Sequence, residues 1–520
     1  MSSLPQLIRR SAQVCGDKTA TRFNDRSHNW LEFQQRISRM AGSLRSLGLG
    51  DGDRAACLAL NSDRYLEFYF GVAWSGAVFV PINIRLAPAE ILYWLNDSGS
   101  KVLFVDATFL PAITKIHAQL ETVEHFVYMS DDTTPQGYLS FEELVTNHAP
   151  INATERSGDD LVAIYYTGGT TGRSKGVMLS HRNLTYNVLQ SAPELKITED
   201  DVYLHSAPMF HIADTIGGMV ASTVGASHVF VPAFDPVKVL KIAQDEKVTV
   251  SLLVPTMINM LVNHPDLPDY DLSSLKNMPY GGSGIPEAVL LKAFEVLPDT
   301  AFVQAYGQTE ASPIITLLGR KYHTISGPYA GKLTAAGKAV PGIDLAILDE
   351  LGQVLPTGEV GEVCIRGDNV MLGYWNLPEM TAEALRGGWL HTGDGGRLDE
   401  DGVLFVVDRV KDMIVSGGEN VYSAETEQAI YTHPAVAECA VIGIPHDEWG
   451  EQVHAIVRLH ESATVTNQHL IDHCKTLIAA FKCPKSIEFR EQPLPLSGAG
   501  KILKKDLREA YWEGQDRNVG

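Results

Sequence analysis

The stretch YTGGTTGRSKG, residues 166–176, directly follows a run of apolar, β-prone residues from Leu161 to Tyr165. Its glycines allow successive backbone N–H groups to point into one concavity, and its hydroxyl side chains add further donors. Lys175 supplies a positive charge at the end of the stretch. The pattern therefore favours an anion-binding loop at the end of a buried strand. A flexible glycine turn is the alternative, because glycine-rich loops also occur without a ligand.

The sequence around this loop alternates between strand-like and helix-like segments. Buried strands are predicted at residues 102–105, 161–165 and 248–254, and an amphipathic helix at 286–294 begins with proline. Such alternation predicts an α/β architecture.

The pattern of predicted secondary structure changes toward the C-terminus. From about Ile343 it shows short strands and glycine turns. After about Asp408, the pattern predicts a small α+β unit with helices at 424–432 and 468–481 and strands at 440–444 and 453–459. We therefore predict two domains, residues 1–410 and residues 411–520.

The composition excludes several classes of protein. Of the 520 residues, 63 are acidic and 42 basic, which gives a net charge of −21 and argues against nucleic acid or an anionic membrane surface as the main partner. The six cysteines form no CxxC pair, which indicates a reducing compartment. No run of about 18 apolar residues and no apolar leader is found, so we expect a cytoplasmic protein without a membrane span.

Two segments reverse this acidic character. Residues 161–193 contain three basic residues and no acidic one, and residues 482–508 contain seven basic and three acidic residues. Local positive charge in an acidic protein indicates sites that meet anions.

The glycine-rich stretch is not a Walker A loop, because Lys175 follows a serine and precedes a glycine. It resembles instead the phosphate loop of the adenylate-forming superfamily, which includes acyl-CoA synthetases, luciferases and peptide-synthetase adenylation domains. The usual form is YTSGTTGxPKG, and this chain departs from it at Gly168 and Ser174. Four further stretches match the family in its order, between about residues 160 and 505. The resemblance implies a large N-terminal α/β domain with a distorted β-barrel subdomain, and a small, mobile C-terminal α+β domain.

The resemblance also implies roles for residues near the phosphates of ATP. In the stretch YGQTE, residues 306–310, Glu310 would hold Mg²⁺, Thr309 would contact phosphate, and Tyr306 and Gly307 would lie against the nucleotide. A carboxylate beside a hydroxyl suits Mg²⁺. A glutamate taken alone is more often a solvated surface residue, but among these matches the functional interpretation of Glu310 is favoured. The remaining nucleotide contacts implied are Thr167 (also as a Mg²⁺ ligand), Gly168, Gly169, Thr170, Thr171, Gly172, Lys175, Gly282 and Ser283.

Two stretches match the ribose site and the hinge of the family. In GWLHTGD, residues 388–394, and DRVKD, residues 408–412, the resemblance assigns Asp394 and Arg409 to the ribose and Lys411 to the hinge. A carboxylate can accept both hydrogen bonds of a diol, and a guanidinium can reach its oxygens. A turn aspartate and a surface ion pair are the alternatives.

The last matches concern the C-terminal part. Lys501, in GKILKK at residues 500–505, resembles the lysine that bridges the carboxylate and the α-phosphate during adenylation. Gly417, Gly418 and Glu419 resemble the loop that lines the pantetheine tunnel. A solvated basic tail is the alternative, and it fits Lys504 and Lys505 better than Lys501.

The acyl pocket is expected near PMFH, residues 208–211. His211 is interpreted as a pocket wall, since His205 and His211 lack the neighbours of a metal site. Gly217, Gly218 and Gly282 would leave room there for an extended or bulky apolar acid.

Together these residues predict a ligase that uses ATP, Mg²⁺ and coenzyme A. It would convert a small-molecule carboxylic acid, a fatty or other hydrophobic acid, first to an acyl-adenylate and then to a thioester. A free-standing adenylation enzyme that serves a carrier protein or another acceptor is one alternative. A non-catalytic acyl-AMP-binding protein is another, although Lys501, Glu310 and Asp394 are all present. The acid and the oligomeric state, including a homo-oligomer, stay open.

Overall fold

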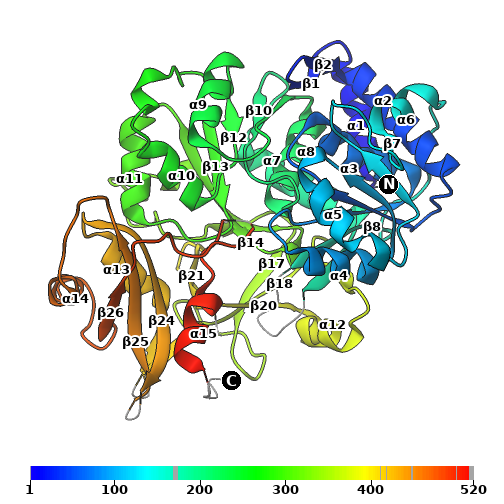
Figure 1. Cartoon of the computed structure of the whole chain (residues 1–520). Helices are drawn as coiled ribbons and strands as arrows, with labels where there is room; N and C mark the ends of the chain where they lie inside the picture. Colours follow the sequence, from blue (N-terminus) through cyan, green and yellow to red (C-terminus); the bar gives the residue numbers. More distant parts are fainter. Residues whose placement is uncertain are drawn as a thin grey trace.

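The computed structural model describes residues 2–167, 174–409, 412–416, 419–446, 449–498 and 500–513. Figure 1 shows a large N-terminal part, coloured blue to yellow, and a smaller C-terminal part, coloured orange to red, below one side of it. The architecture is mixed α/β, as the alternation of segments predicts.

Two large sheets form the frame of the N-terminal part. The first has the strand order β16-β15-β14-β13-β12-β10-β11-β1-β2. Its strands are Lys338–Ala339, Ile314–Leu318, Ala301–Gly307, Asn277–Gly281, Val250–Ser251, Val202–His205, Ser227–Phe230, Thr19–Phe23 and Arg26–Asn29, in that order. The inner strands run parallel, and β14, β15 and β16 form an antiparallel edge.

The second sheet has the order β19-β9-β8-β4-β3-β5-β6-β7. Its strands are Gly373–Tyr374, Lys175–Ser180, Leu161–Thr167, Val78–Pro81, Arg54–Leu58, Ser100–Val105, His125–Tyr128 and Leu139–Ser140. Here β8 and β9 are antiparallel neighbours on either side of the glycine-rich stretch.

Helices pack on both sheets. They are α1 (Leu4–Cys15), α2 (Trp30–Ser46), α3 (Asp63–Ser75), α4 (Pro88–Ser98), α5 (Leu110–Ile116), α6 (Phe141–Asn147), α7 (His181–Leu195), α8 (Ile212–Val224), α9 (Pro236–Asp245), α10 (Pro255–Val262), α11 (Glu287–Val296) and α12 (Pro378–Ala384). The largest apolar cluster draws buried side chains from both sheets and from α1, α2, α3, α7 and α8. Burial of this apolar surface holds the two sheets in one body.

An antiparallel sheet follows in the chain, with the order β17-β18-β20-β21. Its strands are Asp344–Leu348, Gly361–Arg366, Leu390–Leu398 and Leu404–Arg409. It leads directly into the C-terminal part.

The C-terminal part is built on a sheet of β23 (Glu419–Val421), β22 (Ile414–Ser416), β25 (Gly450–Leu459) and β24 (Val436–His446), with β26 (Ser486–Phe489) paired to β25. Its helices are α13 (Ser423–Tyr431), α14 (Asn467–Lys475) and α15 (Lys504–Trp512). This part has an apolar cluster of its own, around Ile414, Val441 and Leu470. The fold is therefore a large N-terminal domain and a small C-terminal domain, while the boundary at 410/411 stays a prediction.

Two predicted elements are shorter than expected. The strand predicted at 248–254 is a strand only at Val250–Ser251, because Leu253 adds a single bridge to Tyr280 and Pro255 begins α10. The helix predicted at 468–481 ends at Lys475. The hydroxyl of Thr476 donates to the carbonyl oxygen of His473 at 2.7 Å and so competes with the helical hydrogen bond.

Side-chain contacts join the two domains. The guanidinium of Arg85 donates to the carbonyl oxygen of Ser497 at 2.8 Å, and Thr256 donates to that of Gly500 at 3.1 Å. At the end of β21, the Asp408 carboxylate accepts hydrogen bonds from the backbone N–H and the hydroxyl of Ser423. These contacts fix one orientation of the small domain against the large one.

Among the helices described, none is both long and apolar enough to cross a membrane.

Candidate active site

Several predicted site residues lie outside the described residues. They are Gly168, Gly169, Thr170, Thr171 and Gly172 of the glycine-rich stretch, Lys411 of the predicted hinge, and Gly417 and Gly418 of the predicted tunnel. Glu419 is exposed on β23. The roles assigned to all of these stay predictions.

Lys175 and Glu310 are brought together by Tyr374. Lys175 begins β9 and pairs in register with Thr167 at the end of β8. Its Nζ atom lies 4.4 Å from the centre of the Tyr374 ring. The Tyr374 hydroxyl donates to Oε1 of Glu310 at 2.9 Å. One aromatic side chain thus connects the lysine and the carboxylate that the sequence assigns to phosphate and Mg²⁺.

The surroundings of Glu310 suit a divalent cation. Its side chain is buried in a short 3₁₀ turn, Thr309–Ala311. Within the described residues, no lysine, arginine or histidine forms an ion pair with it. Burial, and then the charge of Glu310, raises the pKa of Tyr374, so this hydroxyl stays a donor at neutral pH. A buried carboxylate without a cationic side chain is stable when a cation binds it, and an oxygen donor is what Mg²⁺ prefers.

Tyr306 and Asp394 form the nucleotide side of the site. The Tyr306 hydroxyl, from β14, donates to Oδ2 of Asp394 at 2.7 Å. Asp394 lies on β20, directly opposite Arg409 on β21. Gly307 has no room for a side chain, because a Cβ atom there would lie 1.8 Å from the carbonyl oxygen of Pro313. These positions place a carboxylate and a tyrosine ring on neighbouring sheets.

The small domain brings Lys501 to the large one. Gly282 has a φ of +87°, and a Cβ atom at that position would lie 3.5 Å from Cε of Lys501. The Lys501 N–H donates to the hydroxyl of Ser497 at 3.1 Å, and Ser497 is the residue that Arg85 holds. Lys501 therefore lies over the Gly282 segment in this orientation of the domains, while Ser283 beside it is exposed.

His211 is close enough to Lys501 to feel its charge. Burial, and then the positive charge of Lys501, lowers the pKa of His211 to about 3. Nδ1 of His211 accepts the N–H of Ala213 at 3.2 Å, so His211 caps the N-terminus of helix α8. A neutral imidazole is therefore expected at this position, as fits a pocket wall. Asp214, in the first turn of α8, accepts a hydrogen bond from buried His205 at 2.6 Å.

The glycines of α8 have a packing explanation. A Cβ atom at Gly217 would lie 2.2 Å from the hydroxyl of Tyr203, and one at Gly218 would lie 2.6 Å from Cε1 of His205. The space that these glycines leave is filled by the protein itself. Their place in an acyl pocket stays a prediction.

Some residues of the site were not foreseen. Tyr374 lies in a two-residue strand within an apolar stretch, which carries no chemical signal of its own. Arg85, Thr256 and Ser497 lie far apart in the sequence and meet only in the fold. Ser423 begins helix α13 and bonds to Asp408, while Tyr422 occupies the cap position of that helix.

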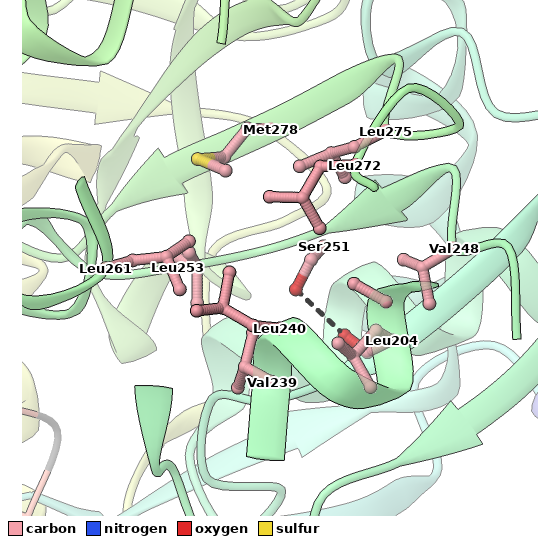
Figure 2. A pocket seen from close by; sticks show the side chains of 11 residues that line it. Leu204, Val239, Leu240, Val248, Ser251, Leu253, Leu261, Leu272, Leu275 and Met278 are labelled. Carbon is pink, nitrogen blue, oxygen red and sulfur yellow. Dashed lines mark hydrogen bonds between the residues drawn. The ribbon is translucent and has the colours of Figure 1, made fainter. Parts of the chain in front are cut away.

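A small cavity of about 10 Å³ lies between the first sheet and helices α9 and α10. Figure 2 shows its apolar lining, including Leu240, Leu253 and Met278. A cavity of this size holds about one water molecule at most. It belongs to the core and lies apart from the predicted site residues.

Comparison with known proteins agrees with this geometry. Residues 8–375 match the AMP-binding enzyme family, and residues 425–501 match the AMP-binding enzyme C-terminal domain. The chain is 38% identical over 504 residues to a feruloyl-CoA synthase of an Amycolatopsis species, covering 96% of this chain and 98% of that protein. It is 36% identical over 512 residues to the fatty acid–[acyl-carrier-protein] ligase ScoC of Streptomyces coeruleorubidus, covering 98% of this chain and 95% of the relative.

A solved structure is also similar over almost the whole chain. The anthranilate CoA ligase AuaEII in complex with anthranoyl-AMP matches with a TM-score of 0.90 and 29% identity, covering 98% of this chain and 97% of that one. Both the sequence matches and this structure cover the large and the small domain. The chain therefore belongs to the AMP-binding enzyme family, and it is an acid–thiol ligase of the acyl-CoA synthetase type.

Proposed function

We propose that the protein converts a hydrophobic carboxylic acid to its coenzyme A thioester in two half-reactions at one site. In the first, a carboxylate oxygen attacks the α-phosphorus of ATP, and pyrophosphate leaves. In the second, the thiol of coenzyme A attacks the carbonyl carbon of the acyl-adenylate, loses its proton, and AMP leaves. Formation of the mixed anhydride first makes the carbonyl carbon a better electrophile for the thiol.

The observation that carries this proposal is the position of Lys501 against Gly282 and near His211. Attack of a carboxylate on a polyphosphate brings two anions together, so a fixed cation between them lowers the barrier. Lys501 would neutralise the carboxylate and the α-phosphate. Thr309, Thr167, Lys175 and the glycine-rich stretch would hold the phosphates.

The nucleotide would be oriented from the other side. Asp394, held by the Tyr306 hydroxyl, would accept hydrogen bonds from the ribose diol, and the guanidinium of Arg409 would donate to oxygens of the ribose. Gly282, Ser283 and Gly307 would leave space for the flat adenine. Glu310 and Thr167 would hold Mg²⁺, which supplies positive charge to the phosphates when it is bound.

The second half-reaction needs space for coenzyme A where Lys501 now lies. We propose that the small domain, residues 411–520, turns about Lys411 after adenylation. This turn would withdraw Lys501 and bring Gly417, Gly418 and Glu419 to the site. A few residues that absorb a change in φ and ψ suffice for such a motion.

The acid is proposed to be a fatty or another hydrophobic acid. The feruloyl-CoA synthase and the fatty acid ligase ScoC have similar identity to this chain, so aromatic and aliphatic acids are both reasonable. His211, as a neutral wall, and Gly217 would border the acyl group.

One experiment tests both the reaction and the acid class. Pyrophosphate release is measured with a panel of straight-chain fatty acids, cinnamic-type acids and short hydrophilic acids, with and without coenzyme A. We expect release that depends on a hydrophobic acid, and a thioester of that acid only when coenzyme A is present. Release with the hydrophilic acids alone would contradict the acid class. Transfer to an acyl-carrier protein but never to coenzyme A would contradict the acceptor.

A further inference from the structure

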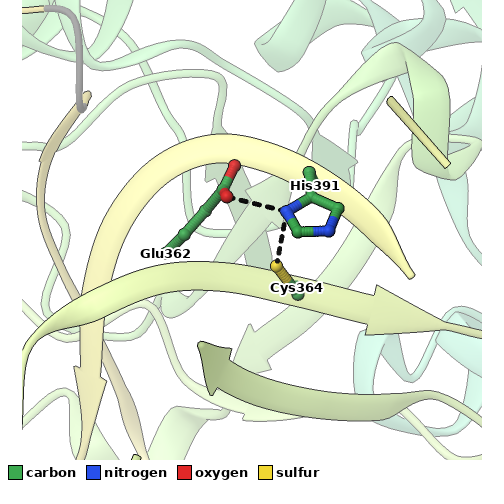
Figure 3. Close-up of side chains that lie close together, drawn as sticks. All are labelled: Glu362, Cys364 and His391. Atoms are coloured by element: carbon green, nitrogen blue, oxygen red, sulfur yellow. Dashed lines mark hydrogen bonds and ion pairs between the residues drawn. The ribbon is translucent and has the colours of Figure 1, made fainter. Parts of the chain in front are cut away.

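Three side chains that can bind metal ions meet on one face of the antiparallel sheet β17-β18-β20-β21. Glu362 and Cys364 are alternate residues of β18, so their side chains point to the same face. His391 on β20 is the cross-strand partner of Cys364. Figure 3 shows the three side chains converging, and their donor atoms all lie within 4.8 Å of one another.

Both contacts within this group are made by one atom, Nδ1 of His391. Nδ1 of His391 lies 2.7 Å from Oε2 of Glu362 and 3.4 Å from Sγ of Cys364. A ring nitrogen carries at most one hydrogen, which points to one acceptor. A cation between the three atoms would satisfy the nitrogen, the sulfur and the oxygen at once.

The environment favours a metal that binds thiolate and imidazole. Cys364 is fully buried, and the His391 side chain is 8% exposed, whereas the Glu362 side chain is 21% exposed. One sulfur, one nitrogen and one oxygen ligand suit Zn²⁺, with a fourth position open to water on the exposed side.

A second group of possible metal ligands differs from the first in the ion pairs that its carboxylates already form. His28, Asp63 and Glu67 also lie close together. However, Arg26 pairs with Asp63 and Arg36 pairs with Glu67, each at 2.8 Å, so these buried carboxylates already have their cations. The cation beside Glu362 is Arg386, at 3.2 Å, and its side chain is half exposed and can turn into solvent.

We propose that Glu362, Cys364 and His391 form a binding site for Zn²⁺, separate from the Mg²⁺ position proposed at Glu310. Binding would release the thiol proton of Cys364, because a thiolate is the ligand, and His391 would bind the metal through Nδ1. Oε1 of Glu362 also accepts the N–H of Gly393 at 3.0 Å, and Asp394 is the next residue. Occupancy would therefore stiffen the turn that carries Asp394. This last consequence rests on the proposed ribose contact, whereas metal binding itself does not.

The test is a titration of the full-length protein with Co²⁺ as a spectroscopic substitute for Zn²⁺. We expect about one equivalent to bind, with a thiolate-to-cobalt charge-transfer band that added Zn²⁺ removes. Cys364→Ser should abolish the band, and His391→Gln should weaken binding by at least about tenfold. Arg386→Gln should strengthen binding several-fold, because it removes a competing positive charge.

A matched control uses other histidines of the chain. His433, His469 and His473 lie together on the small domain, with ring centres 5.1 to 5.4 Å apart. His473→Gln should leave the band and the affinity unchanged. The proposal is overturned by a wild-type protein without the band, by a band that survives in Cys364→Ser, or by one that disappears in His473→Gln. Circular dichroism establishes whether each variant folds. If Cys364→Ser does not fold, Glu362→Gln replaces it, and we expect that variant to bind Co²⁺ more weakly than the wild-type protein.

Discussion

Two tyrosine hydroxyls hold the two carboxylates of the candidate site. Tyr306 donates to Asp394 at 2.7 Å, and Tyr374 donates to Glu310 at 2.9 Å. A hydrogen bond to a carboxylate restricts its rotamers and so fixes where its oxygens point. At the scale of single residues, the site therefore depends on neutral donors as well as on its charged groups.

Replacing Tyr306 with phenylalanine removes the donor and keeps the ring. We expect Tyr306→Phe to raise the KM for ATP by about tenfold, the equivalent of about 1.4 kcal/mol, as for loss of one hydrogen bond to a charged group. The kcat should change less, because the group acts on the ribose and not on the reacting atoms. Steady-state kinetics with varied ATP measures both constants.

Tyr128→Phe is the matched control, since the Tyr128 hydroxyl also donates to an aspartate, Asp132, in another region of the large domain. It should leave the KM for ATP unchanged. A tenfold fall of kcat in Tyr306→Phe, with the KM for ATP unchanged, would contradict the positioning role.

At the scale of elements, helix α8 packs directly on strand β10. Gly217 faces the hydroxyl of buried Tyr203, which also lies 3.5 Å from Asp214. Close approach of a helix to a strand requires a residue without a side chain at the contact. The glycine is thus explained by packing.

Gly217→Ala should destabilise the protein by about 1 to 3 kcal/mol, the usual effect of overpacking a core. Part of this loss should be recovered in Gly217→Ala combined with Tyr203→Phe, which removes the atom that the new Cβ meets. Urea unfolding of the two single variants and the double variant forms a double-mutant cycle. Unchanged stability in Gly217→Ala would contradict the proposed steric conflict with the Tyr203 hydroxyl.

Helix α1 is fixed to α7 by a neutral histidine. The N–H of Leu4 donates to Nδ1 of His181 at 3.2 Å, and His181 is buried. Burial, and then the charge of Arg156, lowers the pKa of His181 to about 4. Below the ordinary value of about 6.5, the unfolded chain therefore binds this proton more readily than the folded one.

Stability from His181 is present above about pH 6.5 and decreases as the pH falls toward 4. Between pH 7.5 and 5, this residue should reduce the free energy of unfolding by about 2 kcal/mol. In His181→Gln, whose amide oxygen can still accept the Leu4 N–H, that pH-dependent part should be absent. Urea unfolding of both proteins at the two pH values measures the difference, and equal losses would show that His181 does not titrate in this way.

The elements also show which features a sequence can predict. The strand Leu161–Thr167 and the helix Glu287–Val296 were foreseen, because local hydrophobic periodicity determines them. The end of α14 and the bond from Ser423 to Asp408 were not, because they depend on side-chain hydrogen bonds that compete with helix geometry. The family motifs named Glu310, Asp394 and Tyr306 as site residues. The bonds of Tyr306 to Asp394 and of Tyr374 to Glu310 join separate segments and could not be read from the sequence.

At the scale of the whole molecule, a net charge of −21 surrounds two positive segments. One contains Lys175 in the large domain and the other contains Lys501 in the small one. Arg85 and Thr256 hold the segment of Lys501 against the large domain. The place of Lys501 in the candidate site therefore depends on how the two domains meet.

The most direct test of this account separates the two half-reactions in Lys501→Ala. Acyl-adenylate formation is followed by acid-dependent pyrophosphate release, and thioester formation is followed with supplied acyl-adenylate and coenzyme A. Lys505→Ala is the control, because Lys505 lies in the same segment, is exposed and pairs with Glu509. We predict that Lys501→Ala loses at least about a hundredfold in the first half-reaction, as for removal of a group that stabilises transition-state charge, and keeps most of the second, while Lys505→Ala keeps both. Equal loss of both half-reactions in Lys501→Ala would contradict the proposed division of labour between the two orientations of the small domain.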